Sequence, residues 1–301
     1  MEVGRNNLPF PKGKVTNRYV TKLRQRLNKP TNWQEILKVM YTDVRTQVTG
    51  ALTVEPSVVA GTRGTAYVYD DFTIANTTLT IDQVKNIPIF IDEADRFQQS
   101  YFGSPEIADF QGKKVQEFLE TATLAKHASW VDFGQGDLDN TSADDTTQIT
   151  VSATNIDDMI RAIRRKIFSN NGLDVARENG IFSIWRASDW EFLEAFMQSN
   201  GFNLADDALK NGAPLGVYYM GMYHYLSNDH TANHLFAGVR KVGKELGILR
   251  GTYGRPKFIE DPGLKSGLGI VQRLDFGFAF PSDATPSTQR VAEMNIDVNV
   301  V

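Results

Sequence analysis

The chain has 301 residues, a length that suits one large domain or two interleaved ones. Its formal net charge of −4 indicates no particular partner, and its 41% of hydrophobic residues can bury a sizeable core. The absence of cysteine excludes disulfides, thiolate metal sites and thiol catalysis. The N-terminal sequence lacks the apolar core of a signal peptide, and no stretch of about 18 apolar residues occurs, so we expect an intracellular protein without a membrane span.

The first 34 residues are strongly basic. From Val3 to Gln34 there are eight basic residues and no acidic one, so the remainder carries −12, because −12 plus 8 gives −4. Pro9, Pro11, Gly13 and Pro30 interrupt this segment, which predicts an extended arm. The arm is either a flexible tail or a contact to acidic neighbours or nucleic acid. The residues expected to make that contact are Lys12, Lys14, Arg18, Lys22, Arg24 and Arg26.

A helix and then strands are expected next. Apolar residues at helical spacing predict a short helix from Trp33 to Val48, and residues 50–103 have the character of strands. The segment Thr77 to Asp92 predicts a hairpin with its turn near Lys85 and Asn86. Pro88 cannot donate to a strand ladder and favours an edge position. The apolar residues that alternate along this hairpin are Leu79, Ile81, Ile87, Ile89 and Ile91.

The longest expected helix follows the hairpin. Ser104 is a candidate N-cap, Pro105 suits the first helical position, and apolar residues recur at spacings of three and four until about Trp130. This pattern predicts a rod of about 39 Å. The stretch 132–147 is rich in Asp, Gly, Ser and Thr, which predicts a loop and a domain boundary.

Residues 150–250 are expected to form a compact α/β unit. The expected elements are a helix capped by Asn155 and ended by Asn171-Gly172, a strand at Gly180–Arg186, a helix with a Ser188/Glu191 capping box that ends near Gly201, strands within Leu215–Leu226, and a helix from about Asn233 to Leu249. Strict alternation then predicts a strand over Val291–Val301.

Candidate catalytic groups are few. His224, Asp229, His230 and His234 lie close together in sequence, and His230 and His234 have a spacing that zinc sites use. There is no H-E-x-x-H motif, so histidines in a loop and a helix cap are the simpler interpretation. The segment Gly238 to Glu245 nearly matches a phosphate-binding loop, but Glu245 replaces the required hydroxyl and would repel phosphate.

Two acidic clusters also lack the partners that catalysis needs. Asp92, Glu93 and Asp95 follow the hairpin, and Arg96 comes directly after them. The loop 132–145 fails the calcium-loop pattern, because it lacks Gly and Glu at the required offsets. We therefore expect no catalytic, cofactor or metal site, and a structural or binding role.

The order of elements resembles the Hong Kong 97-type major capsid protein of tailed viruses. Four stretches carry this resemblance before the closing strands: LTIDQVKNIPIFIDEADRFQQS, FQGKKVQEFLETATLAKHASWVD, GIFSIWRASDWEFLEAF and LKNGAPLGVYYMGMYHYLSND. LGIVQRLDFGFAF and VAEMNIDVNV resemble the strands that return to the peripheral sheet. The resemblance covers about 50–301, without a scaffolding segment at the N-terminus.

The resemblance implies an α+β fold with an N-terminal arm at 1–49, an extended loop with peripheral-domain strands at 50–103, a spine helix with peripheral domain at 104–148, an axial domain at 149–265, and closing peripheral strands at 266–301. It implies a non-enzymatic shell subunit that assembles as hexamers and pentamers around double-stranded DNA, contacted non-specifically. The expected partners are scaffolding, portal and cement proteins, with assembly in the host cytoplasm and a final place in the virion. An encapsulin-like compartment shell and a metal-dependent enzyme that uses the histidine cluster are the alternatives.

The hairpin and the arm are expected to contact neighbouring subunits. A two-stranded hairpin is marginally stable alone in water, so it needs a surface to lie on. We expect its five apolar residues to bury against the spine helix of an adjacent subunit.

Overall fold

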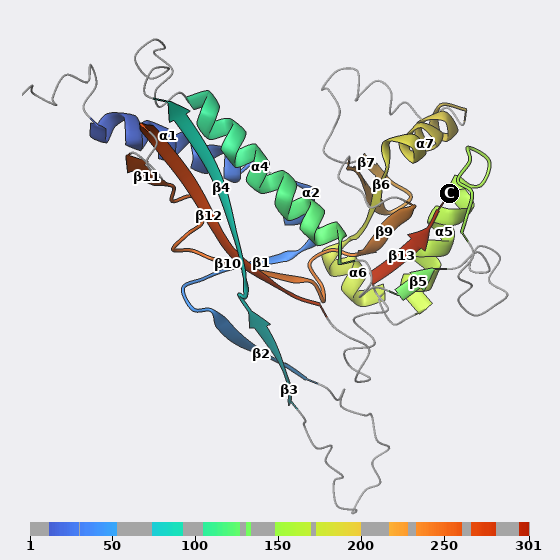
Figure 1. The fold of residues 1–301 in the computed structure, drawn as a ribbon. Helices are drawn as coiled ribbons and strands as arrows, with labels where there is room; N and C mark the ends of the chain where they lie inside the picture. The colour runs from blue at the N-terminus through green and yellow to red at the C-terminus, as the bar shows by residue number, and fades with distance from the viewer. Residues whose placement is uncertain are drawn as a thin grey trace, which may run out of the picture.

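A computed structural model describes residues 12–29, 31–52, 74–92, 105–126, 131–133, 148–169, 173–199, 217–227, 233–260, 266–280 and 295–300. The helices are α1 (Lys12–Leu27), α2 (Asn32–Ile36), α4 (Pro105–Leu124), α5 (Ile156–Ile167), α6 (Leu173–Asn179) and α7 (Ala187–Ser199). The strands are β1 (Lys38–Thr42), β2 (Thr46–Leu52), β3 (Ile74–Thr80), β4 (Gln83–Asp92), β5 (Val131–Phe133), β6 (Ile181–Trp185), β7 (Val217–Tyr219), β8 (Met222–Leu226), β9 (His234–Val239), β10 (Glu245–Leu249), β11 (Lys257–Glu260), β12 (Gly267–Ala279) and β13 (Asn295–Asn299). These strands form sheets of six, five and two strands (Figure 1).

The six-stranded sheet has the order β5-β13-β9-β6-β8-β7 and mixes parallel and antiparallel pairs. β7 and β8 form a hairpin through Met220 and Gly221, whose φ angles are 48° and 79°. Two consecutive positive φ angles match the right-handed twist of paired strands, so this turn is compatible with the sheet.

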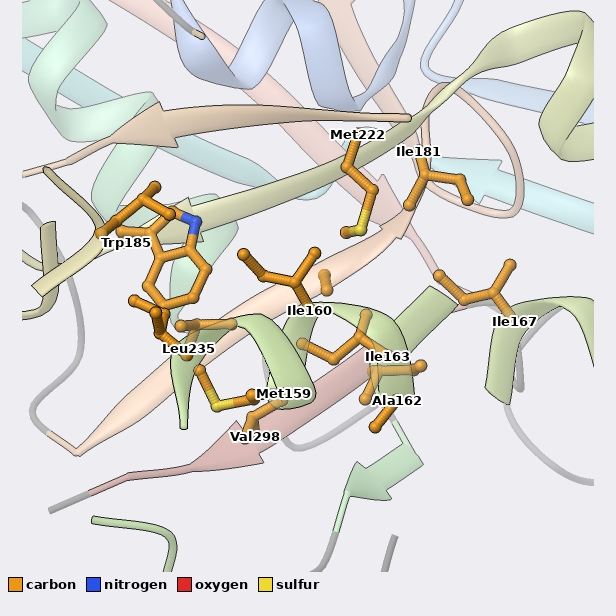
Figure 2. Close-up of a cluster of buried hydrophobic side chains, with 14 of the residues drawn as sticks. Met159, Ile160, Ala162, Ile163, Ile167, Ile181, Trp185, Met222, Leu235 and Val298 are labelled. Carbon is orange, nitrogen blue, oxygen red and sulfur yellow. The ribbon is translucent and has the colours of Figure 1, made fainter. Parts of the chain in front are cut away.

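Helix α5 supplies the core on one face of this sheet. Its stripe of Ile156, Met159, Ile160, Ile163 and Ile167 is fully buried, as the spacing predicted. Figure 2 shows Met159, Ile160, Ile163 and Ile167 of this stripe among side chains of the sheet. Those strand residues include Ile181 and Trp185 from β6, Met222 from β8, Leu235 from β9 and Val298 from β13. The predicted strand at 180–186 and the strands within 215–226 are confirmed.

The five-stranded sheet is built around the long strand β12. One side of β12 pairs with β10 and β11, the other side pairs with β4, and β1 adds to β10. Among the described residues β4 pairs with β12 alone, so Pro88 lies on an edge strand as expected. Leu268, Ile270, Leu274 and Phe276 of β12 face a core shared with α1 and α4.

Helices α1 and α4 lie side by side on that face (Figure 1). Tyr19, Leu23 and Leu27 of α1 are buried at spacings of four residues. Gly112 of α4 allows a close approach, because a Cβ there would lie 2.8 Å from Cγ of Arg26. The segment 12–27 is therefore a docked helix and not the predicted extended arm. Gly13 lies in the first turn of the helix and does not break it, whereas Pro11 lies outside the described residues.

A third core joins the two sheets. β6 has apolar side chains on both faces: Phe182 and Ile184 point away from α5 and pack with Ile36 of α2 and Leu124 of α4. Lys244, fully buried between β9 and β10, donates from Nζ to the Val239 and Val242 carbonyls and to Asn295 Oδ1. Burial lowers the pKa of Lys244 to about 7.

The two-stranded sheet β2–β3 projects away from the rest of the molecule (Figure 1). Its register runs from Thr46 opposite Thr80 to Leu52 opposite Ile74. We call this pair of strands the ribbon. It is an extended hairpin, but β4 is no part of it.

Two predictions between residues 33 and 92 are therefore wrong. The helix expected at 33–48 is confined to α2 and gives way to β1, because Val39 and Tyr41 belong to a strand that pairs in parallel with β10. The expected hairpin at 77–92 is two strands of different sheets, since β3 pairs with β2 and β4 pairs with β12. The change of direction comes at Ile81-Asp82 instead of Lys85-Asn86.

The helix expected at 233–249 is also wrong. Residues 234–249 form β9, a turn and β10, with positive φ at Lys241 (59°) and Gly243 (65°). Apolar residues there fit a helical spacing, but three glycines disfavour a helix, and strand pairing with β6 and β12 decides the outcome.

The remaining elements agree in kind but differ at their ends. The long helix ends at Leu124, about 30 Å after its start, and is shorter than expected. Helix α7 begins at Ala187, so Ser188 lies inside its first turn and the capping box is wrong. Asn155 precedes α5 but makes no side-chain cap bond.

The expected loop begins with β5, and β13 joins the six-stranded sheet instead of returning to the sheet of β12. Ser104, Trp130, the stop at 171–172 and Gly201 lie outside the described residues.

Candidate functional site

The base of the ribbon lies on the outer face of the five-stranded sheet, opposite the helices. Two facing glycines, Gly247 of β10 and Gly277 of β12, form the floor at this point. A Cβ on Gly277 would lie 1.9 Å from the Thr80 carbonyl oxygen, and one on Gly247 would lie 2.9 Å from Leu79. The glycines therefore leave the space in which the end of β3 crosses the sheet.

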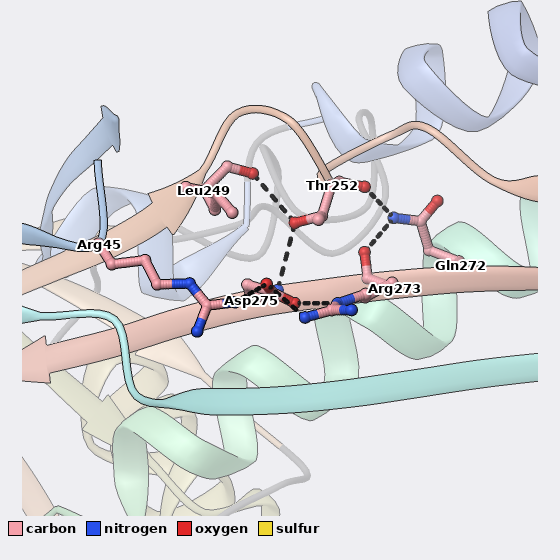
Figure 3. Close-up of polar contacts among 6 residues, drawn as sticks. All are labelled: Arg45, Leu249, Thr252, Gln272, Arg273 and Asp275. Carbon is pink, nitrogen blue, oxygen red and sulfur yellow. Dashed lines mark hydrogen bonds and ion pairs between the residues drawn. The ribbon is translucent and has the colours of Figure 1, made fainter. Parts of the chain in front are cut away.

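A buried carboxylate holds the ribbon at the same place (Figure 3). Asp275 of β12 is 1% exposed and accepts two hydrogen bonds from Arg273, at 2.6 and 2.9 Å. Arg45, the residue before β2, approaches Asp275 at 3.7 Å and accepts a 2.7 Å backbone bond from Ile81 N–H. Thr252 Oγ1 accepts a bond from the Asp275 backbone N–H. The β2 end of the ribbon thus faces the carboxylate through Arg45, and the β3 end is tied to Arg45 by the backbone bond from Ile81.

The five apolar residues predicted to bury against a neighbour lie mostly in the subunit's own core. Leu79 and Ile81 are 1% and 4% exposed. Ile87 and Ile91 pack against the core of α1 and α4, and Ile89 alternates with them on the same face of β4. Leu79 and Ile81 are already buried within their own subunit and leave little surface for the predicted contact with a neighbour, and an intersubunit contact of the hairpin residues stays a prediction.

Exposed apolar side chains lie on the outer face of the same sheet. Phe90 of β4 and Ile259 of β11 flank Gly269 of β12 in one cross-strand row, and each is 42% exposed. Pro88, in the next row, is exposed as well. Sequence alternation marked the opposite, inward face of β4 and missed this one.

The six basic residues predicted to make the contacts of the arm all lie in α1, but they have different surroundings. Arg18 and Lys22 are exposed on the side away from the buried stripe. Arg24 donates from Nε to the Gly254 carbonyl at 3.3 Å, and the stem of Arg26 packs on Gly112. Lys12 and Lys14 are in the first turn of the helix.

The histidines do not form a cluster in the part of the chain that the structure describes. His224 is fully buried, with Nδ1 2.6 Å from Ser183 Oγ and Nε2 3.1 Å from the Tyr219 carbonyl. Burial lowers the pKa of His224 to about 4. His234 pairs with the carboxylate of Asp297, two strands away from His224. Asp229 and His230 lie outside the described residues, among which no group of three His, Asp or Glu could hold a metal.

The other candidate motifs belong to strands and turns of the sheets or lie outside the described residues. The segment Gly238–Glu245 ends β9 and begins β10, and its Lys244 is enclosed, so it forms no phosphate-binding loop. Asp92 ends β4, whereas Glu93 and Asp95 lie outside the described residues. Within the described residues, no helix is both long and apolar enough to cross a membrane.

Comparisons with known proteins give a consistent picture at the level of structure. No family model and no curated protein matches this sequence. The mature capsid of bacteriophage PhiM1 matches with a TM-score of 0.56 and 12% identity, over 91% of this chain and 88% of that one. The capsid of the cyanophage P-SCSP1u matches with 0.53 and 12%, over 91% and 89%. A virus-like particle from Pyrococcus furiosus matches with 0.54 and 9%, over 95% and 98%.

The fold is therefore one that occurs in phage capsids and in a virus-like particle. More narrowly, this mixed helix-and-sheet chain has the capsid fold of tailed phages, as the match to the capsid of Ralstonia phage GP4 also indicates, with a TM-score of 0.55 at 10% identity.

Proposed function

We propose that this protein is the major capsid protein of a tailed virus, which self-assembles as hexamers and pentamers into an icosahedral shell around double-stranded DNA. The observation that carries this proposal is the end-to-end match with phage capsid chains, which covers 91% of this chain and 88% of the PhiM1 chain. A likeness over nearly both whole chains leaves no room for an added catalytic domain in the matched region.

The described elements suit the parts of such a subunit. We assign α4 as the spine helix, the five-stranded sheet with α1 and α4 as the peripheral domain, and the six-stranded sheet with α5, α6 and α7 as the axial domain. The ribbon is then the extended loop. In this assignment β10 and β11 belong to the peripheral domain, although they lie within 149–265, the range predicted for the axial domain. β13 belongs to the axial domain, although it lies within 266–301, the range predicted for the closing peripheral strands.

The ribbon gives the physical reason for assembly. A two-stranded sheet that projects from its subunit is marginally stable in water. The ribbon therefore gains stability by lying across a neighbour. In a closed symmetric shell every such contact is repeated, so interfaces of modest size give a stable particle.

The remaining parts of the proposal follow from a shell role. The subunit is non-enzymatic, assembles in the host cytoplasm and resides in the virion. Scaffolding, portal and cement proteins are its partners besides copies of itself. The packaged DNA is enclosed without sequence-specific contact.

A shortened ribbon tests this proposal. Val48 and Thr78 are paired, so residues 49–77 can be replaced by Asn-Gly, a two-residue turn suited to antiparallel strands. The anchor at Arg45, Leu79 and Ile81 stays intact. We expect this variant to fold with wild-type thermal stability and to form no particles by electron microscopy. Normal particles from the shortened chain would contradict the proposed role of the ribbon.

A bacterial compartment shell is the second candidate, since the matched particle from Pyrococcus furiosus is described as virus-like. The contents of purified particles distinguish the two. Nuclease-protected double-stranded DNA in particles made with the neighbouring viral proteins supports the capsid, whereas particles filled with a protein cargo support the compartment.

A further inference from the structure

The chain passes from the six-stranded sheet to the five-stranded sheet through a short turn between β9 and β10. We call this turn, residues 240–244, the junction turn. Lys241 has a positive φ of 59°, a strained conformation for a residue with a side chain. Its N–H donates to the Ile36 carbonyl at 2.7 Å, and the N–H of Arg240 donates to the Gly180 carbonyl at 2.9 Å. The junction turn is therefore held by the end of α2 and by the residue before β6.

Lys244, the last residue of the junction turn, bonds to both sheets. Its backbone carbonyl accepts a 2.8 Å bond from the N–H of Lys38, at the start of β1 in the five-stranded sheet. Its Nζ donates to the six-stranded sheet, to the Val239 carbonyl of β9 at 2.7 Å and to Asn295 Oδ1 of β13. A third bond, 3.0 Å to the Val242 carbonyl, lies within the turn. One residue thus ties the two sheets together where the chain crosses between them.

The side chain of Lys244 is enclosed by protein. The residue is fully buried, and its Nζ lies 5.1 Å from the centre of the Phe182 ring. Within the described part of the chain no carboxylate pairs with Nζ, because its three acceptors are two backbone carbonyls and one amide oxygen. A buried charge without a counter-ion is costly, and burial lowers the pKa of Lys244 to about 7 from its ordinary value of 10.5.

The charged groups on the elements around Lys244 are engaged with one another. Three ion pairs account for them: Lys38 with Glu245, Arg240 with Glu35, and His234 with Asp297. Strand β6, which supplies Phe182, contains no charged residue. The ammonium of Lys244 therefore has no counter-ion among the described residues that surround it.

We infer that Lys244 acts as a proton-controlled latch between the two sheets: its neutral amine keeps the junction turn in place, and its charged form releases the turn. A neutral amine can stay in the enclosed site and donate to two of the three oxygens. An ammonium gains from contact with water, which reaches Nζ only when the junction turn moves away from β13. This inference goes beyond the proposed shell function, because it concerns motion within one subunit.

The direction of the pH effect follows from the two states of Lys244. In the closed state burial holds the pKa at about 7, whereas a hydrated lysine in the open state has the ordinary value of 10.5. The open state therefore takes up the proton first as the pH falls, and opening becomes more favourable between about pH 10.5 and pH 7. Below pH 7 both states are charged, and the effect is complete.

Hydrogen–deuterium exchange of the full-length chain tests the latch, with the junction turn as the readout. Wild type is compared with Lys244→Met at each pH, because the intrinsic exchange rate then cancels. The exchange of wild type relative to Lys244→Met should rise about 10-fold or more from pH 9 to pH 7. Asn295→Asp, which places a carboxylate against the ammonium, should remove this rise. Lys38→Met, the same change at an exposed lysine beside the turn, should keep it.

Each outcome decides for or against the latch. The same pH dependence in wild type and Lys244→Met would overturn it, since His234 and the other titrating groups are present in both chains. A rise that is equally large in helix α5 would also overturn it, because it would report unfolding of the whole subunit. If Lys244→Met does not fold, wild type and Asn295→Asp decide: an equal rise in both overturns the latch, and its loss in Asn295→Asp supports it. These measurements do not require shells, so the latch can fail while the proposed function stands.

Discussion

The six-stranded sheet and the outer face of the five-stranded sheet are built in different ways. One face of the six-stranded sheet packs against α5, and part of its other face packs against α2 and α4. The side chains in both contacts are almost completely buried. The outer face of the five-stranded sheet is covered by the base of the ribbon at Gly247 and Gly277. Elsewhere on this face, the side chains of Phe90 and Ile259 are exposed to solvent. The first region is packed within one subunit, whereas the second leaves apolar side chains exposed that neighbours can cover under the proposed shell function. Changes in the first should therefore affect folding, and changes in the second should affect assembly.

The largest effect is expected in the α5 core. Ile160→Asp would place a charge among fully buried apolar side chains, and should destabilise the subunit by about 4 kcal/mol or more. Thermal unfolding followed by circular dichroism measures this. Arg165→Ala, at an exposed position of the same helix, should cost less than about 1 kcal/mol. Equal stability of the two variants would contradict the account of this core.

The glycine floor under the ribbon should be the next most sensitive position. Gly277→Ala would force a Cβ to 1.9 Å from the Thr80 carbonyl oxygen, so the end of β3 must move. The expected cost is about 3 kcal/mol, with a further loss of particle yield. Gly251→Ala is the matched control, since nothing lies within 4 Å of its Cβ, and should stay within about 0.5 kcal/mol of wild type.

The buried His224 should make the first region sensitive to acid. Burial holds its pKa at about 4, against an ordinary value of 6.5, so the unfolded chain takes up this proton first. The stability contribution is complete above about pH 6.5 and is lost as the pH falls toward 4. Between pH 7 and pH 5 the loss should be about 2 kcal/mol.

His224→Gln serves as the variant for that measurement, because glutamine takes up no proton in this range. Denaturant unfolding at several pH values should show most of the slope removed. A variant that keeps the full wild-type slope would show that other groups carry the acid sensitivity.

The smallest effect on stability is expected at the ribbon anchor. The Arg45 side chain is 64% exposed and lies 3.7 Å from Asp275, so Arg45→Ala should cost only about 0.5 kcal/mol. It should nevertheless lower particle yield, because Arg45 helps to fix the direction of the ribbon. Arg250→Ala removes a comparable exposed pair with Asp43 and should leave the yield unchanged. Equal particle yields from both variants would show that Arg45 does not help to hold the ribbon.

Periodicity in short stretches of sequence predicted those helices and strands whose residues follow a clear apolar pattern. The stripe of α5, the long helix α4, the strand β6 and the helix α7 all follow from periodicity in short windows. Pairing between distant strands could not be predicted in this way: β4 finds its partner β12 about 180 positions later in the chain, and β9 and β10 belong to different sheets. Alternation alone does not say which sheet a strand joins.

The surfaces were predicted less well than the core for the same reason. The basic residues of α1 were identified, but their helix was missed because Pro11 and Gly13 suggested a break where the helix begins. The stripe of Tyr19, Leu23 and Leu27 was the available signal. Phe90 and Ile259 become one surface only through their common neighbour Gly269, a relation that no short window contains.

Electron microscopy of the purified chain, expressed alone and with its genomic neighbours, shows whether this protein is a shell subunit. We expect uniform polyhedral shells, or rings of six and five subunits. Persistent monomers of 33.7 kDa under every condition would contradict it.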